Sequence, residues 1–316
     1  MGSTAPNPMV GCVIVVNDQI IAEGYTSPYG GSHAEVNAIK AVKDVSLLSK
    51  ATLYVTLEPC SHFGKTPPCS DLISAHKIPR VVIGCIDEHD KVCGKGIAKL
   101  KAAGCEVIVG VLEAECKAHH KRFFTYHTKK RPYIILKWAE SNDGFIAPRS
   151  KSEAKPVWIS NIYSRQLVHQ WRAEEQAILV GANTVVQDNP SLTTREVKGA
   201  NPIRVVIDLK NSLAESYQVF NSDAKTIRLT SKDIDTHHPL ASEVCKALYT
   251  QHITSVIIEG GQKTIQAFID ENLWDEARVF SSQINIKDGV LKPKLKGIPN
   301  SKTPIVSDSL NLFIND

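Results

Sequence analysis

One stretch of the sequence, from His33 to Cys69, most constrains the fold because it holds three side chains that can meet at one metal ion. His33 is followed by Glu35, and Cys60 and Cys69 come later in the stretch. One imidazole and two thiolates suit Zn²⁺ and leave a fourth tetrahedral position for water. An open site with a carboxylate beside it is typical of catalysis. The alternatives are three unrelated residues or a structural zinc knuckle.

The spacing of these residues matches a known catalytic pattern only in part. Zinc enzymes that deaminate nucleobases show H-x-E followed by P-C-x-x-C, with the glutamate as proton carrier. Here Cys69 lies much farther from Cys60 than that pattern allows. His62 could be taken for a fourth ligand, but it would close the site to water, so we do not expect it to bind the metal. We expect Glu58 to be structural.

Length and composition predict a two-domain globular protein without a nucleic-acid footprint. A chain of 316 residues is too long for one compact core. Its hydrophobic content of 42% and charged content of 22% are ordinary. The formal net charge is only +4 and the basic residues are dispersed. The densest basic run, Lys129-Lys130-Arg131, is interpreted as a solvated linker, so we expect no nucleic-acid partner.

The apolar and cysteine patterns favour a cytoplasmic protein. No stretch approaches the ~18 consecutive apolar residues of a membrane span, and the N-terminus lacks a signal-peptide pattern. The eight cysteines do not form the dense, evenly spaced framework of a secreted domain. We therefore expect no membrane partner and a reducing cytoplasm.

Strands and helices are predicted to alternate in the first half of the chain. Two β-branched runs separated by Asn17-Asp18 indicate a hairpin, and apolar residues at helical spacing follow His33. The expected strands are 10–16, 19–24, 52–57, 80–85 and 105–110, and the expected helices are 33–42, 69–77, 95–103 and 113–126. Such alternation implies an α/β fold whose sheet is covered on both faces, with sites at strand-to-helix junctions.

A second domain is predicted to begin after the basic run, where Pro132 follows the charged residues. We expect domains at 1–127 and 128–316. In the second half the expected strands are 133–139, 176–180, 203–208, 225–230, 255–259, 276–284 and 304–314, and the expected helices are 163–174, 239–251 and 262–271. This half contains no G-x-G-x-x-G after a strand, so the usual dinucleotide fingerprint is missing.

Three segments of the first half resemble one family. They are Ala5-Pro6-Asn7-Pro8-Met9-Val10-Gly11-Cys12, His33-Ala34-Glu35, and Thr56-Leu57-Glu58-Pro59-Cys60-Ser61-His62 continuing to Pro67-Pro68-Cys69. They are similar to the bifunctional riboflavin-biosynthesis deaminase/reductase family. The resemblance implies a cytidine-deaminase-like three-layer domain followed by an α/β domain similar to dihydrofolate reductase.

Three segments of the second half resemble the reductase part of the same family. They are Lys137-Trp138-Ala139-Glu140-Ser141-Asn142-Asp143-Gly144, then Gly181-Ala182-Asn183-Thr184-Val185 with Asp188-Asn189-Pro190-Ser191-Leu192-Thr193-Thr194-Arg195, and Val256-Ile257-Ile258-Glu259-Gly260-Gly261. A glycine pair at a helix N-terminus can receive cofactor phosphate through backbone N–H groups.

The resemblance implies roles for individual residues. In the first domain Glu35 would be catalytic, His33, Cys60 and Cys69 would hold zinc, and Asn7, Lys65 and Thr66 would contact substrate. In the second domain Lys137, Leu192, Arg195 and Glu259 would contact substrate, and Ala139, Trp158, Thr184, Asp188, Gly260 and Gly261 would bind NADPH. Locally, Asn7 could be a turn residue, Lys65 and Thr66 a solvated loop, Trp158 a core aromatic and Arg195 a surface arginine. Lys137 lies in an apolar strand, where a buried cation needs a partner.

The implied reactions are hydrolysis of the 2-amino group of 2,5-diamino-6-ribosylamino-4(3H)-pyrimidinone 5′-phosphate, then NADPH-dependent reduction of the ribosyl group to ribityl. The substrate would thus be a small phosphorylated pyrimidine, and the family suggests a homodimer through the reductase domain. Two features depart from the family pattern: no helix precedes the Asn7 motif, and Lys155-Pro156-Val157 replaces a small polar residue before Trp158. Two alternatives are a nucleic-acid base deaminase, which needs a basic aromatic channel, and a ligand sensor with a structural zinc.

Overall fold

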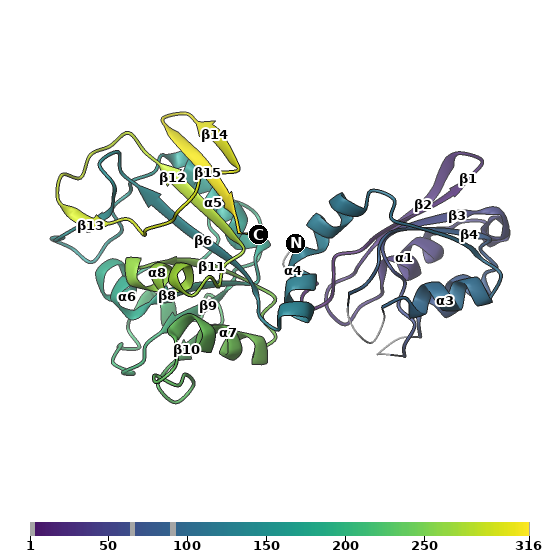
Figure 1. The fold of residues 1–316 in the computed structure, drawn as a ribbon, viewed down its shortest axis with the longest axis horizontal. Helices are drawn as coiled ribbons and strands as arrows, with labels where there is room; N and C mark the ends of the chain where they lie inside the picture. The colour runs from purple at the N-terminus through teal and green to yellow at the C-terminus, as the bar shows by residue number, and fades with distance from the viewer. Residues whose placement is uncertain (1–3, 64–66, 89–92, 316) are drawn as a thin grey trace. The chain divides into compact units, whose positions relative to one another are not determined.

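The computed structural model describes residues 4–63, 67–88 and 93–315. The chain forms two compact units, residues 3–130 and residues 131–316. The division lies at the end of the long helix α4, within the basic run that the sequence interprets as a linker (Figure 1). Each unit contains its own sheet and its own hydrophobic core.

The sheet of the first unit has five strands in the order β2-β1-β3-β4-β5. Their bounds are β1 Gly11–Val16, β2 Gln19–Tyr25, β3 Thr52–Leu57, β4 Arg80–Cys85 and β5 Glu106–Val109. Strand β1 pairs antiparallel with β2 and β3, and β3, β4 and β5 run parallel. The predicted hairpin at Asn17-Asp18 is confirmed, with both turn residues at positive φ.

Helices cover both faces of this sheet. Helices α1 Ala34–Ala41, α2 Cys69–Ala75 and α3 Lys95–Ala102 share one core with alternate residues of β1, β3 and β4. The long helix α4 Glu113–Lys129 packs on the opposite face against β4. A short 3₁₀ turn, Val45–Lys50, connects α1 to β3. The arrangement is a three-layer α/β/α domain (Figure 1).

Glu58 is structural, as the sequence predicts. It is buried at the carboxyl end of β3. Its Oε1 accepts hydrogen bonds from the backbone N–H groups of Gly96 at 2.9 Å and Ile97 at 3.2 Å, and its Oε2 accepts one from Gly94 at 2.9 Å. These donors belong to the start of α3, where N–H groups have no partner within the helix. Glu58 therefore anchors the start of α3 to the end of β3, two residues before Cys60.

The second unit is built on an eight-stranded sheet in the order β10-β9-β8-β11-β6-β12-β15-β14. The bounds are β6 Tyr133–Glu140, β8 Ala177–Gly181, β9 Ile203–Ile207, β10 Thr226–Leu229, β11 Ser255–Gly260, β12 Glu276–Ser281, β14 Ser301–Ile305 and β15 Asp308–Ile314. The six strands from β10 to β12 are parallel, and β15 and β14 are antiparallel additions at one edge. Parallel strands buried on both faces explain the continuous apolar runs of β6, β8 and β11.

Four helices and two cores flank this sheet. The helices are α5 Ile162–Glu174, α6 Ala182–Asp188, α7 Leu240–Thr250 and α8 Gln262–Asp270, with a 3₁₀ turn at Gln218–Phe220. One hydrophobic core contains buried side chains of α7 and α8, and the other contains buried side chains of α5. Two strands outside the main sheet, β7 Phe145–Pro148 and β13 Gly289–Leu291, pair with each other.

The sequence prediction of one terminal strand at 304–314 is wrong. The structure has a hairpin, β14–β15, whose turn includes Val306 at positive φ. The sequence also does not predict β7, β13 or the short helix α6. All three elements are short, and the pairing of β7 with β13 joins segments that lie far apart in the chain.

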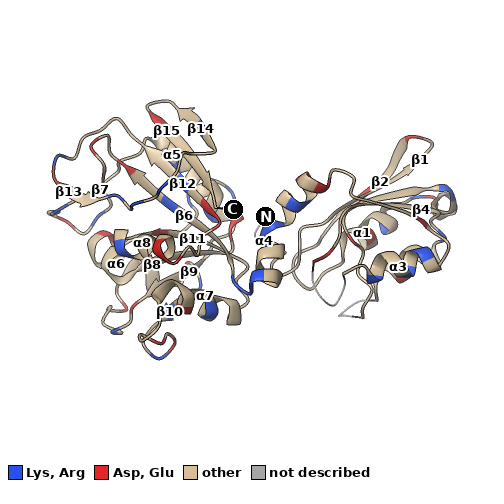
Figure 2. Cartoon of the chain, viewed as in Figure 1, with Lys and Arg blue, Asp and Glu red and all other residues tan. Residues whose placement is uncertain are grey.

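Lys and Arg are interspersed with Asp and Glu on both units, without a basic stripe over the described residues (Figure 2). Within the described part of the chain, no helix is both long enough and apolar enough to cross a membrane.

Candidate active sites

Three predicted metal ligands converge in the first unit. His33 is the N-cap residue of α1, Cys60 follows the end of β3, and Cys69 begins α2. The Nδ1 of His33 lies 3.5 Å from the Cys60 Sγ and 3.3 Å from the Cys69 Sγ. All three ligand atoms lie within 4.8 Å of one another. One imidazole and two sulfurs at this spacing fit a zinc ion.

Among the described residues, three side chains belong to this group of candidate metal ligands. His62, the candidate fourth ligand that the sequence analysis rejects, is exposed and does not belong to the group of converging donors. It lies instead in the lining of the neighbouring cavity. Three protein ligands leave a coordination position for a reacting molecule.

Glu35 lies in the first turn of α1, beside the predicted metal ligands. Its side chain is buried and lines a cavity of about 310 Å³ together with His33 and Cys60. Burial raises the pKa of the Glu35 carboxyl to about 7. A carboxyl group with a pKa near neutrality can take up a proton and return it, which is the property that acid–base catalysis requires.

The thiols of Cys60 and Cys69, two of the predicted metal ligands, have pKa values shifted in opposite directions. Hydrogen bonding from Cys69, assisted by His33, lowers the pKa of Cys60 to about 4. The same contact with Cys60, together with burial, raises the pKa of Cys69. Because the two sulfurs titrate as a pair, the first proton leaves easily and the second is retained. A bound cation would favour loss of both protons.

Other residues complete the first cavity. Asn7 lines it, whereas Lys65 and Thr66 lie outside the described residues. Two rings of α4 that the sequence analysis missed, Phe123 and His127, also line it, with their centroids 4.4 Å apart. No motif marks them, because they reach the site through the packing of a helix that is distant in sequence.

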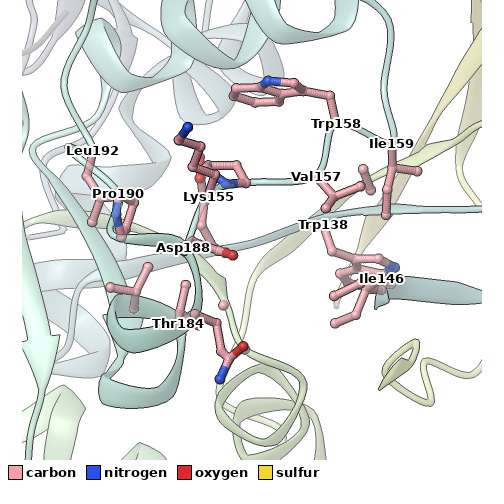
Figure 3. A pocket seen from close by; sticks show the side chains of 18 of the residues that line it. Trp138, Ile146, Lys155, Val157, Trp158, Ile159, Thr184, Asp188, Pro190 and Leu192 are labelled. Atoms are coloured by element: carbon pink, nitrogen blue, oxygen red, sulfur yellow. The ribbon is translucent and has the colours of Figure 1, made fainter. Parts of the chain in front are cut away.

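A larger cavity of about 780 Å³ lies in the second unit at the carboxyl ends of β6, β8 and β11. This is where ligands bind in open parallel sheets. Every residue that the sequence analysis assigns to substrate or NADPH in this half lines it. Figure 3 shows Thr184, Asp188 and Leu192 on one side and Trp138 with Ile146 on another.

A buried ion-pair network forms one wall of this cavity. Arg172 of α5 donates to Glu259 of β11, with 2.8 Å between Nη2 and Oε2. Burial, opposed by Glu259, lowers the pKa of Lys137. Burial alone would raise the pKa of Glu259, but the Arg172 and Lys137 charges lower it to about 2. Glu259 thus pairs with Arg172, and its negative charge also favours the protonated form of Lys137.

The glycine pair before α8 fits a phosphate group. Gly261 is the N-cap residue of α8, so the free N–H groups of the first turn begin there. A Cβ atom on Gly260 would lie 3.0 Å from the Thr184 Oγ1, and one on Gly261 would lie 3.3 Å from it. The close approach of Thr184 of α6 to this turn thus favours glycine at both positions. The free N–H groups at the start of α8 suit the pyrophosphate of a dinucleotide.

Two further predicted cofactor residues have partners in the structure. Asp188 forms an ion pair with Lys151, which also donates to the carbonyl of Lys155 at 3.3 Å. Trp158 is 56% exposed, so it is not a core aromatic, and the Arg165 guanidinium lies 4.7 Å from its ring centroid. Lys151, Arg165 and Arg172 all line the cavity, and sequence reasoning singled out none of them.

Comparison with known proteins identifies the family. The family described as the cytidine and deoxycytidylate deaminase zinc-binding region matches residues 1–85, and the RibD C-terminal domain matches residues 132–284. The riboflavin biosynthesis protein RibD of Aquifex aeolicus is 40% identical over 295 residues, covering 88% of this chain and 82% of that one. The chain belongs to the RibD family.

Other members agree with this assignment. The RibD protein of Actinobacillus pleuropneumoniae is 38% identical, covering 98% of this chain and 84% of that one. The crystal structure of a diaminohydroxyphosphoribosylaminopyrimidine deaminase/5-amino-6-(5-phosphoribosylamino)uracil reductase from Thermotoga maritima is similar with a TM-score of 0.88. It is 37% identical, with 100% of this chain and 94% of that chain covered.

Membership in the RibD family confirms the central sequence predictions. The fold class is a deaminase domain followed by a RibD reductase domain. The chain is a bifunctional deaminase and reductase of riboflavin biosynthesis that uses zinc and NADPH. The alternatives of a nucleic-acid base deaminase and a ligand sensor are therefore set aside.

Proposed function

We propose that the deaminase domain, residues 1–127, hydrolyses the 2-amino group of 2,5-diamino-6-ribosylamino-4(3H)-pyrimidinone 5′-phosphate. The reductase domain, residues 128–316, would then reduce the ribosyl group of the product to ribityl. The observation that carries the first step is the convergence of three ligand atoms within 4.8 Å beside buried Glu35. The RibD relatives, and the deaminase and reductase activities of the Thermotoga maritima protein, support the substrate.

In the deaminase domain His33, Cys60 and Cys69 would hold zinc. When bound, zinc supplies a Lewis acid that makes water nucleophilic near neutral pH. The Glu35 carboxylate would take one proton from the attacking water and pass it to the pyrimidine ring nitrogen. It would then take the second proton from the hydroxyl group added to the ring carbon and give it to the leaving amine, so that the C=O bond forms as ammonia departs. Asn7, Lys65 and Thr66 would contact the substrate, with Asn7 supported by its place in the cavity lining.

In the reductase domain NADPH supplies the hydride, which would be delivered to C1′ of the sugar. Ala139, Trp158, Thr184, Asp188, Gly260 and Gly261 would bind this cofactor, and Lys137, Leu192, Arg195 and Glu259 would contact the substrate. Their common place around one cavity supports these roles. The buried Lys137 ammonium is a proton source close to the reacting sugar, with Glu259 stabilising its charged form.

One incubation tests both activities. The protein is mixed with the diaminopyrimidine phosphate and NADPH, and ammonia and NADPH absorbance are followed together. We expect ammonia release first and NADPH oxidation after it, in equal amounts. Ammonia without NADPH oxidation would contradict the second step, and neither signal from zinc-loaded protein would contradict the whole proposal.

Replacing Arg195 by alanine is expected to weaken binding of the phosphorylated substrate about 10- to 100-fold, because a guanidinium–phosphate contact is worth ~1.5–3 kcal/mol. NADPH affinity should change less than 3-fold. The reductase KM for substrate and the Kd for NADPH measure the two effects. An equal loss of both would contradict the substrate assignment.

The two domains are expected to be separable. A fragment of residues 131–316 keeps Arg131, whose buried guanidinium bonds the Asp275 carboxylate, with Nη2 2.8 Å from Oδ1. Because each unit has its own core, the fragment should fold and bind NADPH with a Kd within about 3-fold of that of the full chain. Fluorescence titration measures this. An insoluble fragment, or one that does not bind, would argue against separable domains.

We further propose a homodimer through the reductase domain, in a reducing cytoplasm. Exposed apolar side chains gather where α5 begins and the β14–β15 turn lies: Ile162, Tyr163 and Val306. These two segments are joined by the Asn161 Nδ2, which donates to the Ile305 carbonyl at 2.7 Å. All eight cysteines are free, which suits a reducing compartment. Sedimentation equilibrium of the wild type and of Tyr163→Glu tests the dimer; an unchanged mass would contradict this surface.

A further inference from the structure

The segment that carries Arg195 has little regular structure to hold it. Between α6 and β9 the chain runs without strand or helix, and Asn189 and Leu192 both adopt positive φ. A positive φ is uncommon for residues other than glycine, and it persists where surrounding contacts determine the backbone conformation. The place of the Arg195 side chain therefore depends on bonds from neighbouring elements to this segment.

Helix α5 supplies two of these bonds. The Nη1 of Arg172 donates to the carbonyl of Thr193 at 3.3 Å. One turn earlier on the same helix, the Nδ1 of His169 accepts the backbone N–H of Arg195 at 3.3 Å. His169 is buried and lines the cavity, so a bond from its ring fixes the Arg195 backbone from the inner side.

The direction of the Arg195 side chain follows from this anchor. Its Nη1 donates to the Thr193 Oγ1 at 3.2 Å and also bonds the Ser191 hydroxyl. Both acceptors belong to the same segment, so they orient the guanidinium within it without tying it to the rest of the domain. The hydrogen bond to His169 links the backbone of Arg195 to helix α5.

We propose that His169 is a positioning residue of the reductase: by accepting the backbone N–H of Arg195, it holds the guanidinium where it meets the phosphate of the substrate. The inference rests on the proposed role of Arg195. His169 itself would touch neither the phosphate nor the reacting sugar.

The bond requires a neutral imidazole, because a protonated ring has no acceptor at Nδ1. Burial, with the positive charges of Arg172 and Arg195, lowers the pKa of His169 to about 4. Glu196, whose carboxylate lies 4.0 Å from Nε2, and Glu259 oppose this effect. The ring thus remains an acceptor at neutral pH.

A pair of substitutions separates hydrogen bonding from packing. His169→Asn places an acceptor oxygen at the position of Nδ1 but removes the ring, whereas His169→Phe keeps a ring and removes the acceptor. We expect His169→Phe to raise the KM for phosphorylated substrate roughly 10-fold, since the Arg195 backbone N–H loses its partner on α5. Its kcat and its Kd for NADPH should change less than about 3-fold, and His169→Asn should remain within about 3-fold of wild type. If only packing matters, the order of the two variants is reversed, which overturns the proposal. Should the Phe variant not fold, His169→Leu replaces it.

Combining His169→Phe with Arg195→Ala tests whether His169 acts through Arg195, separately from whether Arg195 binds the phosphate. Because His169 acts through Arg195, adding His169→Phe to Arg195→Ala should raise KM no further. Additive losses would contradict positioning through Arg195. An unchanged KM in Arg195→Ala would remove the phosphate role of Arg195, and with it the reason for the anchor. A raised KM in Arg195→Ala with none in His169→Phe would overturn the inference alone.

Discussion

Replacing Glu35 by glutamine is expected to lower deamination about 10²- to 10⁴-fold while zinc stays bound, because an amide cannot accept and return the proton of the attacking water. The side chains have nearly the same shape, and Glu35 does not belong to the group of converging metal donors. Ammonia release at saturating substrate and zinc content per chain measure the two effects. Substantial remaining deamination would remove Glu35 from its role.

Two controls accompany this variant. The same protein, supplied with the deaminated intermediate, should oxidise NADPH at the wild-type rate, because the second unit has its own core and cavity. Glu58→Gln changes another buried glutamate of the same cavity, but one that accepts backbone N–H groups at the start of α3. It should lower thermal stability, whereas Glu35→Gln should not.

Replacing Glu259 by glutamine is expected to destabilise the reductase domain by about 3–5 kcal/mol, because it leaves the Arg172 and Lys137 charges buried without their anion. The Arg172 and Glu259 side chains are only 11% and 9% exposed. The lowered pKa of Glu259, about 2 against an ordinary 4.5, corresponds to about 3 kcal/mol. Urea unfolding at pH 7 measures the loss, and NADPH oxidation should fall with it.

The stability that the Glu259 carboxylate contributes is expected to depend on pH. A carboxyl group with a depressed folded-state pKa stabilises the fold above its unfolded pKa, near 4.5, and this contribution is lost as the pH falls towards about 2. The difference between wild type and Glu259→Gln should therefore shrink between pH 5 and pH 2. Glu215→Gln is the matched control: Glu215 pairs with Arg228, but its side chain is 79% exposed. It should cost less than about 1 kcal/mol, and an equal loss in both variants would contradict a special role for burial.

Predictions from the sequence succeeded where a residue type or a short pattern carries the chemistry. Residue type and flanking motifs predict His33, Cys60 and Cys69 as metal ligands, and the structure brings their ligand atoms within 4.8 Å of one another. Lys137 in an apolar run requires a buried anion, and Glu259 supplies it. Regular elements were also predictable, because β3 and β4 lie where apolar β-branched runs place them.

Predictions failed where a contact joins segments that no pattern relates. The terminal residues form a hairpin, β14–β15, because a turn at Val306 lets both halves pair, and an apolar run alone does not reveal the break. Phe123 and His127 line the first cavity only because α4 packs on the sheet. In the same way, Arg172 and His169 look like ordinary helix residues until α5 places them beside Glu259 and Arg195.

The sequence by itself determined the α/β class and the family. It also predicts His33, Cys60 and Cys69 as zinc ligands and Glu35 as the proton carrier, because these predictions depend on side-chain chemistry and on patterns within one segment. Tertiary structure alone decided which charges neutralise one another at the second cavity, which helix holds the Arg195 segment, and which rings line the first cavity. Those features depend on distances between residues far apart in the chain, and such distances exist only after the sheets and helices have packed.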